Sequence, residues 1–388
     1  MLHFDFDRLH RVGLTPALAD RARTCTLGSE ERLELLRVTS VHRETLQLHD
    51  GLAEGSARQL PRLARQLLDS GTMLAVGDWV LASRDGSGAR WVQQRVPPLS
   101  HIARRDGDGS RHPVVSNVDW ALLVMGLDDD FNLRRLERYL TLAYASGVAP
   151  IVVLTKADIA AADPALRDER LAALAKRIPG CRGNVALPLS SIPPGDGRSE
   201  AASSGRAVET VLVDATDPGS AARFAHVACG GQTLVLLGSS GAGKSTLTNT
   251  LLGNAVQDTG AVREHDSRGM HTTTARSLHL LPGGACVIDT PGLRTLRPDI
   301  DEATLAASFG DVETLAGQCR FRDCTHGDEP GCAVREGVDP DRLRNFHKLL
   351  RETRRDSMTW VERRQQLSAW KSRGKETRVR MKLKRGEG

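Results

Sequence analysis

The segment Gly238–Ser245 has the residue types and spacing of a loop that binds phosphate. Its glycines would let successive backbone N–H groups point at a β-phosphate where a helix starts. Lys244 would neutralise phosphate oxygens, and Ser245 offers a hydroxyl to Mg²⁺. An apolar run over 233–237 precedes this loop and a helical pattern over 246–252 follows it. We therefore predict a nucleotide site whose phosphate-binding residues are Gly238, Ser239, Ser240, Gly241, Ala242, Gly243, Lys244, Ser245 and Thr246.

A second phosphate-facing element is predicted at Asp289-Thr290-Pro291-Gly292, directly after the apolar run 285–288. A carboxylate at such a strand end can hold Mg²⁺ through water, and the N–H of Gly292 could meet a γ-phosphate. The element follows the phosphate loop by about forty-five residues. We expect Asp289 to share the metal with Ser245.

The segment Thr155-Lys156-Ala157-Asp158 carries the groups that select a guanine base. A carboxylate at Asp158 could accept from N1–H and the exocyclic amine, and the Lys156 stem would lie along the purine face. The segment resembles the GTPase motif N-K-x-D, with Thr155 in the place of asparagine. It predicts GTP rather than ATP as the nucleotide.

The order of these elements indicates circular permutation. In ordinary GTPases the base-reading segment follows the phosphate loop, whereas here it precedes Gly238 by about eighty residues. Permutation keeps the native contacts when the old termini lie close together and the new ones fall in a surface loop. The chain then leaves this domain just after Gly292, so a nucleotide-dependent change at 289–295 could pass directly to the C-terminal segment.

A cluster of cysteine and histidine predicts one structural zinc ion. Three thiols and one imidazole lie within fourteen residues, at Cys319, Cys324, His326 and Cys332. This is the composition of a closed tetrahedral zinc site, which would add folding energy to a polar loop. The chain has seven cysteines, an odd number, and three of them lie in this cluster, so metal ligation in a reducing compartment is favoured over a disulfide framework.

The chain of 388 residues is long enough for three domains, and 40% hydrophobic content with 26% charged residues is typical of a globular protein. We expect an N-terminal extension over 1–32, a small all-β barrel over 33–112, an α/β GTPase domain over 113–300, and a zinc-binding helical domain over 301–388. Within the GTPase domain, a Pro-, Gly- and Ser-rich stretch over about 180–207 is predicted to be an exposed insertion. No long apolar run or basic leader is present, so we expect a cytoplasmic protein without a membrane partner.

The C-terminal segment is basic. From Arg363 to Arg385 there are ten Lys or Arg against one acidic residue. A helix is predicted from Asp341 to about Trp370, with an apolar face for packing and with Arg342, Arg344, Lys348, Arg351, Arg354 and Arg355 pointing outward. Such a face would contact RNA phosphates without choosing a sequence.

Together these motifs resemble the ribosome small-subunit-dependent GTPases of bacteria, the RsgA/YjeQ family. The resemblance covers about Leu33 to Trp370. It implies an OB-fold barrel, a permuted GTPase domain and a zinc domain in series, with the small ribosomal subunit and its rRNA as partners. Its carriers are Asn117-Val118-Asp119, Phe131-Asn132-Leu133, Thr155 to Asp158, Gly238 to Thr246, His271-Thr272-Thr273-Thr274, Asp289 to Leu293, and Cys319 to Cys332.

The resemblance also implies further site residues. Judged by spacing, the family's serine-alanine element beside the base falls at Asp214-Ala215, and Ser190 is a competing candidate. The family's switch element corresponds to 269–274, with Met270 in the place of arginine, and Thr273 is the expected switch ligand of Mg²⁺.

Catalysis would rest on Lys244 and on a group that orients water. Many GTPases have glutamine directly after the glycine of D-x-x-G, but this chain has Leu293, so we predict slow intrinsic hydrolysis. His271 beside the switch threonines is the internal candidate for orienting water, and a histidine without that role is the alternative.

Three functional hypotheses follow. The first is a ribosome-stimulated GTP hydrolase that assists late maturation of the small subunit as a monomer. The second is a nucleotide-gated RNA-binding factor with negligible turnover, and the third is an ATPase.

Overall fold

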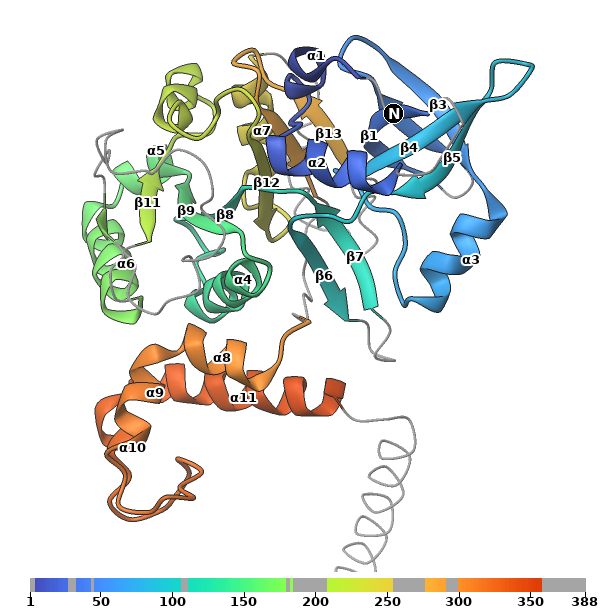
Figure 1. The fold of residues 1–388 in the computed structure, drawn as a ribbon. Coiled ribbons are helices and arrows are strands. Elements are labelled where there is room, and N and C mark those ends of the chain that lie inside the picture. The colour runs from blue at the N-terminus through green and yellow to red at the C-terminus, as the bar shows by residue number, and fades with distance from the viewer. Residues whose placement is uncertain are drawn as a thin grey trace, which may run out of the picture.

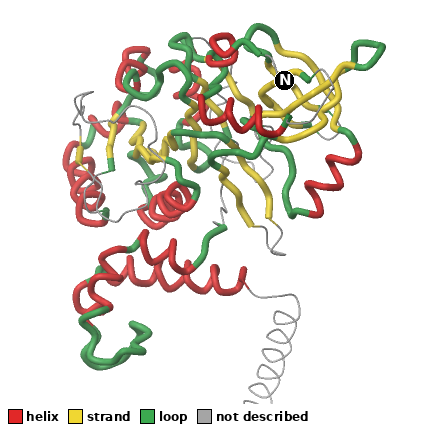
Figure 2. The backbone as a smooth tube through the Cα atoms, in the orientation of Figure 1, coloured by secondary structure: helices red, strands yellow, loops and turns green. Residues whose placement is uncertain are grey.

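A computed structural model gives the fold and describes residues 4–26, 33–42, 45–105, 111–178, 182–183, 208–253, 276–290 and 299–357 (Figure 1). Helices and strands mix in its N-terminal and central parts, whereas the C-terminal part consists of helices and loops (Figure 2). None of the helices within these ranges combines the length and hydropathy that crossing a bilayer requires.

Two short helices of the N-terminal extension pack on the barrel that follows. They are α1 (Phe6–His10) and α2 (Pro16–Cys25), and the side chains of Asp5 and Thr15 accept from backbone N–H groups in their first turns. Leu14 and Leu18 are buried in one cluster with Trp79 of the barrel. The described part of the extension is therefore a covering layer with its own share of the core.

The predicted all-β barrel is confirmed. Strand β1 pairs with both β2 and β4, which closes the ring in the order β1-β2-β3-β5-β4. A helix between the third and fourth strands and a closed five-stranded ring are features of the OB-fold that the family resemblance implied. The elements are β1 (Glu34–Val41), β2 (Leu46–His49), β3 (Glu54–Gln59), α3 (Pro61–Asp69), β4 (Trp79–Arg84) and β5 (Arg90–Arg95).

A separate hairpin connects the barrel to the central domain. It consists of β6 (His101–Arg105) and β7 (Arg111–Ser116), which pair antiparallel. The domain border expected between residues 112 and 113 thus lies inside a strand. Val115 of this hairpin also bridges to Val76, just before β4, which ties the hairpin to the barrel.

The central domain is a parallel sheet with the strand order β10-β11-β9-β8-β12-β14-β13, in which only β13 runs antiparallel to its neighbour. One pair, Ser40 with Ser277, joins this sheet to the barrel. The strands are β8 (Trp120–Gly126), β9 (Ala149–Thr155), β10 (Arg182–Gly183), β11 (Glu209–Leu212), β12 (Thr233–Gly238), β13 (Ser277–Leu280) and β14 (Cys286–Asp289).

Helices cover both faces of this sheet, as its nearly continuous apolar strands require. Leu136 and Leu174 pack on one face, whereas Phe224 and Leu247 pack on the other. The apolar runs predicted over 233–237 and 285–288 and the helical pattern predicted over 246–252 are confirmed. The helices are α4 (Leu133–Ala145), α5 (Ala157–Ala161), α6 (Pro164–Arg177), η2 (Pro218–Phe224) and α7 (Lys244–Leu252).

The C-terminal domain has a core of its own below the sheet in Figure 1. Leu305, Phe309 and Phe346 are among its buried side chains. Its last helix was predicted to reach Trp370, and residues beyond Ser357 lie outside the described part. The helices are α8 (Glu302–Ser308), α9 (Gly310–Ala316), α10 (Ala333–Gly337) and α11 (Pro340–Ser357).

Candidate nucleotide site and metal cluster

The predicted phosphate loop runs from the end of β12 into α7. Gly241 and Gly243 have φ angles of 82° and 88°, a conformation that favours glycine. The ammonium of Lys244 donates to the carbonyl of Ser239 at 2.6 Å and is almost fully buried. Burial lowers the pKa of Lys244, whereas the carboxylates of Asp289 and Asp130 act in the opposite direction. The loop thus holds a cation at its centre, as a phosphate site requires.

Asp289 ends β14 directly beside this loop. Its Oδ2 accepts from the Ser245 hydroxyl at 3.3 Å, while its buried Oδ1 has no hydrogen-bond partner among the described residues. Burial raises the pKa of Asp289, and Lys244 opposes that shift. A buried carboxylate oxygen without a partner next to a hydroxyl fits a hard divalent cation such as Mg²⁺. The other residues expected here, Gly292, Thr273 and His271, lie outside the described part of the chain.

Thr155 lies at the end of β9, and its side chain is fully buried. Its hydroxyl donates to the carbonyl of Ala242 in the phosphate loop at 2.7 Å. A Cβ atom on Gly243 would lie 3.4 Å from the same hydroxyl oxygen. The residue that departs from N-K-x-D therefore joins the base-reading segment to the phosphate loop.

The rest of the base-reading segment faces the end of β11. Lys156 has a φ of 61° and pairs with Asp128 at 2.6 Å, and Asp158 is exposed in the first turn of α5. The N–H of Ala157 donates to the carbonyl of Val213 at 3.3 Å. This bond places the base-reading segment beside Asp214, and a contact of Asp214 with the base stays a prediction.

The loop of Asp214 and Ala215 is held by local hydrogen bonds. The Asp214 carboxylate accepts from the N–H and the hydroxyl of Thr216 at 2.8 and 2.6 Å. The hydroxyl of Thr250 in α7 donates to the carbonyl of Ala215. This loop therefore connects the base end of the site to the helix after the phosphate loop. The competing candidate Ser190 lies outside the described residues.

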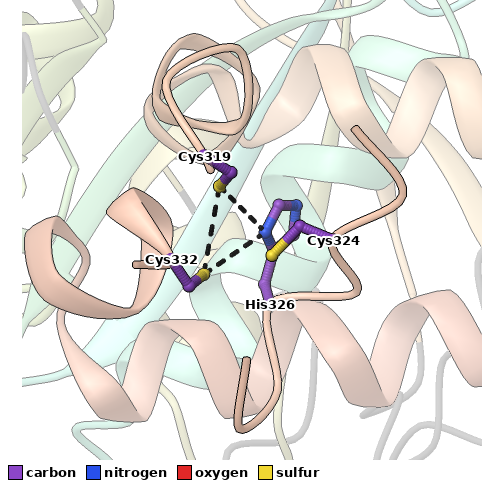
Figure 3. A group of neighbouring side chains, drawn as sticks. All are labelled: Cys319, Cys324, His326 and Cys332. Atoms are coloured by element: carbon purple, nitrogen blue, oxygen red, sulfur yellow. Dashed lines mark hydrogen bonds between the residues drawn. The ribbon is translucent and has the colours of Figure 1, made fainter. Parts of the chain in front are cut away.

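The cysteine and histidine cluster assembles between α9 and α10 (Figure 3). Its four candidate ligand atoms lie within 4.8 Å of one another. The Nδ1 of His326 is 3.7 Å from the Cys319 sulfur and 3.6 Å from the Cys332 sulfur. Zinc bonds of about 2.3 Å to sulfur and 2.0 Å to nitrogen in a tetrahedron give separations of this size. The donor set and spacing fit one structural Zn²⁺.

The cluster also organises the surrounding backbone. The Cys332 sulfur accepts from the N–H of Arg335 at 3.4 Å and caps α10, while His326 adopts a φ of 61°. Cys319 and Cys324 pack against the apolar core of the C-terminal domain. A metal bound here would therefore stabilise the core as well as the loop.

Comparison with known proteins decides the family. The family model for the RsgA GTPase matches residues 96–178 and 199–298. The small ribosomal subunit biogenesis GTPase RsgA of Xanthomonas axonopodis pv. citri is 43% identical over 324 residues, which cover 81% of this chain and 80% of that protein. This chain belongs to the RsgA GTPase family.

Further members of the RsgA family and two solved structures agree. The small ribosomal subunit biogenesis GTPase RsgA 2 of Vibrio vulnificus is 36% identical and covers 88% of each chain. YjeQ from Thermotoga maritima matches with a TM-score of 0.54 at 21% identity, over 83% of this chain and 98% of that one. YloQ, described as a circularly permuted GTPase, matches with a TM-score of 0.53 at 19% identity, over 86% and 99%. The predicted permuted GTPase fold is confirmed.

In this RsgA family member, α4 connects the nucleotide domain to the zinc-cluster domain through buried charges. Glu137 of α4 is almost fully buried and accepts from Arg177 of α6 at 2.7 Å. It also accepts from Arg342 at 2.5 Å and from Asn345 at 2.6 Å, both on α11. We call these four residues the Glu137 cluster.

The expectation that Arg342 points outward was wrong. Its guanidinium is buried, bonded to Asp311 at 2.7 and 2.8 Å, and lies 4.5 Å from the centre of the Phe309 ring. Helical spacing alone places it on the polar side of α11, but α4, with its buried Glu137, lies against that side. The other predicted outward residues are exposed: Arg344, Lys348, Arg351, Arg354 and Arg355.

Sequence reasoning missed two acidic residues at the nucleotide site. Asp128 pairs with Lys156, and Asp130 accepts from the Ser239 hydroxyl at 2.5 Å. The only signal was three consecutive aspartates, 128–130, which follow the end of β8.

Proposed function

We propose that this chain is a GTP hydrolase that is stimulated by the small ribosomal subunit and assists its late maturation. The observation that carries the proposal is the match over most of the chain to relatives that are named for small ribosomal subunit biogenesis. The phosphate loop with its buried Lys244 and the adjoining base-reading segment supply a matching nucleotide site.

In this proposal each polar group of the site has one task. Lys244 neutralises phosphate oxygens and Asp158 selects guanine. Ser245, Asp289 and the switch residue Thr273 hold Mg²⁺, which supplies positive charge to the transferring phosphoryl group. Asp214 and Ala215 complete the contacts to the base, and Gly292 completes those to the γ-phosphate.

Turnover without a partner is expected to be slow, because Leu293 cannot align a water molecule. We propose His271 as the group that orients water once the partner is bound. The test is His271→Ala in the presence of small subunits. Unchanged stimulated turnover with intact nucleotide binding rejects this role.

The zinc-cluster domain and the basic segment after it are proposed to hold rRNA. Exposed arginine and lysine side chains on α11 support phosphate contacts. The protein would act as a cytoplasmic monomer, with one Zn²⁺ as a structural ion.

The test is GTP hydrolysis with and without purified small subunits, with ATP as the competing nucleotide. We expect slow turnover alone and a stimulation of at least about tenfold, a change of 1.4 kcal/mol in barrier. Binding of the subunit without stimulation supports the alternative of a nucleotide-gated RNA-binding factor. Tighter binding of ATP than of GTP contradicts the assignment of the base.

A further inference from the structure

The turn between β8 and α4, residues 127–132, lies against both ends of the nucleotide site. It contains three consecutive aspartates with different surroundings: Asp128 and Asp130 are half-buried, whereas Asp129 is exposed. The two half-buried carboxylates contact different motifs of the site.

Asp130 contacts the phosphate end. Its Oδ1 accepts from the hydroxyl of Ser239 at 2.5 Å, and the carbonyl of Ser239 in turn accepts from Lys244 at 2.6 Å. The same carboxylate pairs with Arg135 at 2.5 Å, which offsets its negative charge near a site for an anion. Asp130 thus fixes the loop residue that holds the phosphate-binding lysine.

Asp128 contacts the base end. Its Oδ2 pairs with the ammonium of Lys156 at 2.6 Å. Lys156 has a φ of 61°, a left-handed conformation that costs a lysine about 1 kcal/mol and persists only where neighbours hold it. Burial alone would raise the pKa of Asp128, but Lys156 and the N–H of Asp130 hold it below its usual value, so the carboxylate stays charged.

The turn itself is held in one conformation. The N–H of Asp130 donates to the Asp128 carboxylate at 3.2 Å, and the N–H of Leu127 donates to the carbonyl of Thr155 at 3.0 Å. A Cβ atom on Gly126 would lie 2.3 Å from the Asp128 carboxylate, so this approach requires glycine. A turn held in this way can fix the positions of both segments that it contacts, the phosphate loop and the base-reading segment.

We propose that Asp128 and Asp130 are positioning residues for the nucleotide: Asp128 sets the base-reading segment through Lys156, and Asp130 sets the phosphate loop through Ser239. The inference rests on the proposed function, because it deepens the account of the same site. It concerns purine nucleoside di- and triphosphates, whose two ends these segments contact.

The two positions have separable effects. Loss of the Asp128 charge frees Lys156 and, two residues later, Asp158, so the preference for GTP over ATP falls. Loss of the Asp130 charge disturbs a loop that binds phosphates of both nucleotides, so both bind more weakly and the preference stays. A general loss of stability would not produce this division.

The experiment compares Asp128→Asn and Asp130→Asn with Asp129→Asn, a control with the same charge change in the same turn. Dissociation constants for GDP, GTP and ATP are measured by calorimetry with Mg²⁺, together with unfolding midpoints. We expect Asp128→Asn to weaken guanine nucleotides about fivefold and to reduce the GTP preference, and Asp130→Asn to weaken all three about fivefold. Asp129→Asn should match the parent protein.

A double-mutant cycle with Ser239→Ala makes the test independent of folding defects. If Asp130 acts through Ser239, the two changes together weaken binding little more than either alone. Additive effects, or behaviour of Asp128→Asn equal to that of Asp129→Asn, overturn the inference. A parent protein that binds no GTP sinks the proposed function instead, so the two failures are distinguishable.

Discussion

The hydroxyl of Thr155 joins two motifs that lie far apart in the chain, because it donates to the carbonyl of Ala242 in the phosphate loop. An asparagine amide at this position could donate in the same way, so the substitution keeps a donor at the place where the motifs meet. The departure from N-K-x-D therefore preserves the link between base end and phosphate end.

We predict that Thr155→Val weakens nucleotide binding about tenfold, whereas Thr155→Ser changes it little. Valine has the shape of threonine but leaves the buried carbonyl of Ala242 without its donor, which costs about 1–3 kcal/mol. Calorimetric titration with GDP gives the two affinities. Equal affinities for the two variants would show that the hydroxyl has no such role.

At the residue scale, the sequence was sufficient where a motif has fixed spacing. The phosphate loop and the four residues of the metal cluster could be located in this way, and the structure brings the cluster together. Asp128 and Asp130 could not be found, because their partners are more than twenty residues away and no motif encodes such contacts. The role of Thr155 needed the same long-range contact.

At the scale of elements, the Glu137 cluster decides how α4 and α11 dock. Two guanidinium groups and one amide surround a single carboxylate with almost no exposure to water. Replacing one charge in such a group leaves the others buried without full compensation. Removing the charge of Glu137, Arg177 or Arg342 is therefore expected to weaken the packing of α4 against α11.

We predict that Glu137→Gln lowers the free energy of unfolding of the C-terminal domain by about 3 kcal/mol. The matched control is Glu352→Gln, which removes a more exposed partner of Arg138 on the same pair of helices and should cost less than about 1 kcal/mol. Denaturant unfolding and hydrogen exchange of α11 measure both. Similar costs for the two variants would contradict a central role for Glu137.

A second contact between elements, the pair formed by His226 and Glu209, depends on pH. His226, just after η2, pairs with Glu209 of β11 at 3.0 Å, and this hydrogen bond raises the pKa of His226 despite its partial burial. Because the folded protein binds the proton more tightly, the stabilisation is full below the unfolded pKa of 6.5 and is lost as pH rises through the folded value.

We therefore predict that the free energy of unfolding falls by about 1 kcal/mol between pH 6 and pH 9 through this pair. The measurement is denaturant unfolding across this range for the parent protein and for His226→Gln. The difference between the two should shrink as pH rises. A constant difference would mean that the pair contributes nothing that depends on the proton.

Element types followed from the sequence because apolar runs and helical spacing are local properties. The strands 233–238 and 286–289 and the helix 244–252 agree with the apolar runs and the helical pattern that predicted them. The burial of Arg342 could not be predicted, because it depends on Glu137, which lies more than two hundred residues away. Such long-range pairs determine how the domains dock, and helical spacing gives no information about them.

At the scale of the whole molecule, Arg37 of the barrel lies where the extension and the nucleotide domain meet. Its guanidinium is fully buried, donates to the carbonyls of Val12 and of Asn117, and lies 5.6 Å from the centre of the Trp79 ring. The described part of the extension is thus packed into the junction of barrel and sheet. The sequence alone did not indicate this packing role for residues 1–32.

The C-terminal domain contacts the nucleotide domain through helix α4, which begins directly after the turn 127–132. Asp130 in that turn contacts the phosphate loop, and Arg135 in the first turn of α4 pairs with Asp130. The Glu137 cluster follows on the same helix. A contiguous set of contacts therefore leads from the phosphate loop to the zinc-cluster domain, in addition to the covalent connection after Asp289.

Because the metal cluster lies at 319–332 and contributes no residue to the nucleotide site, it should matter for subunit-stimulated turnover and not for nucleotide binding. We predict that Cys324→Ser leaves GTP affinity and intrinsic turnover within about twofold but lowers stimulation by the small subunit at least tenfold, because a metal-free loop loses its folding energy. Cys229→Ser removes an exposed thiol outside the cluster and serves as the control. Hydrogen exchange should show faster exchange over residues 317–333 in Cys324→Ser alone. Full stimulation despite that faster exchange would mean that the small subunit is bound through another surface, either the barrel or the basic face of α11.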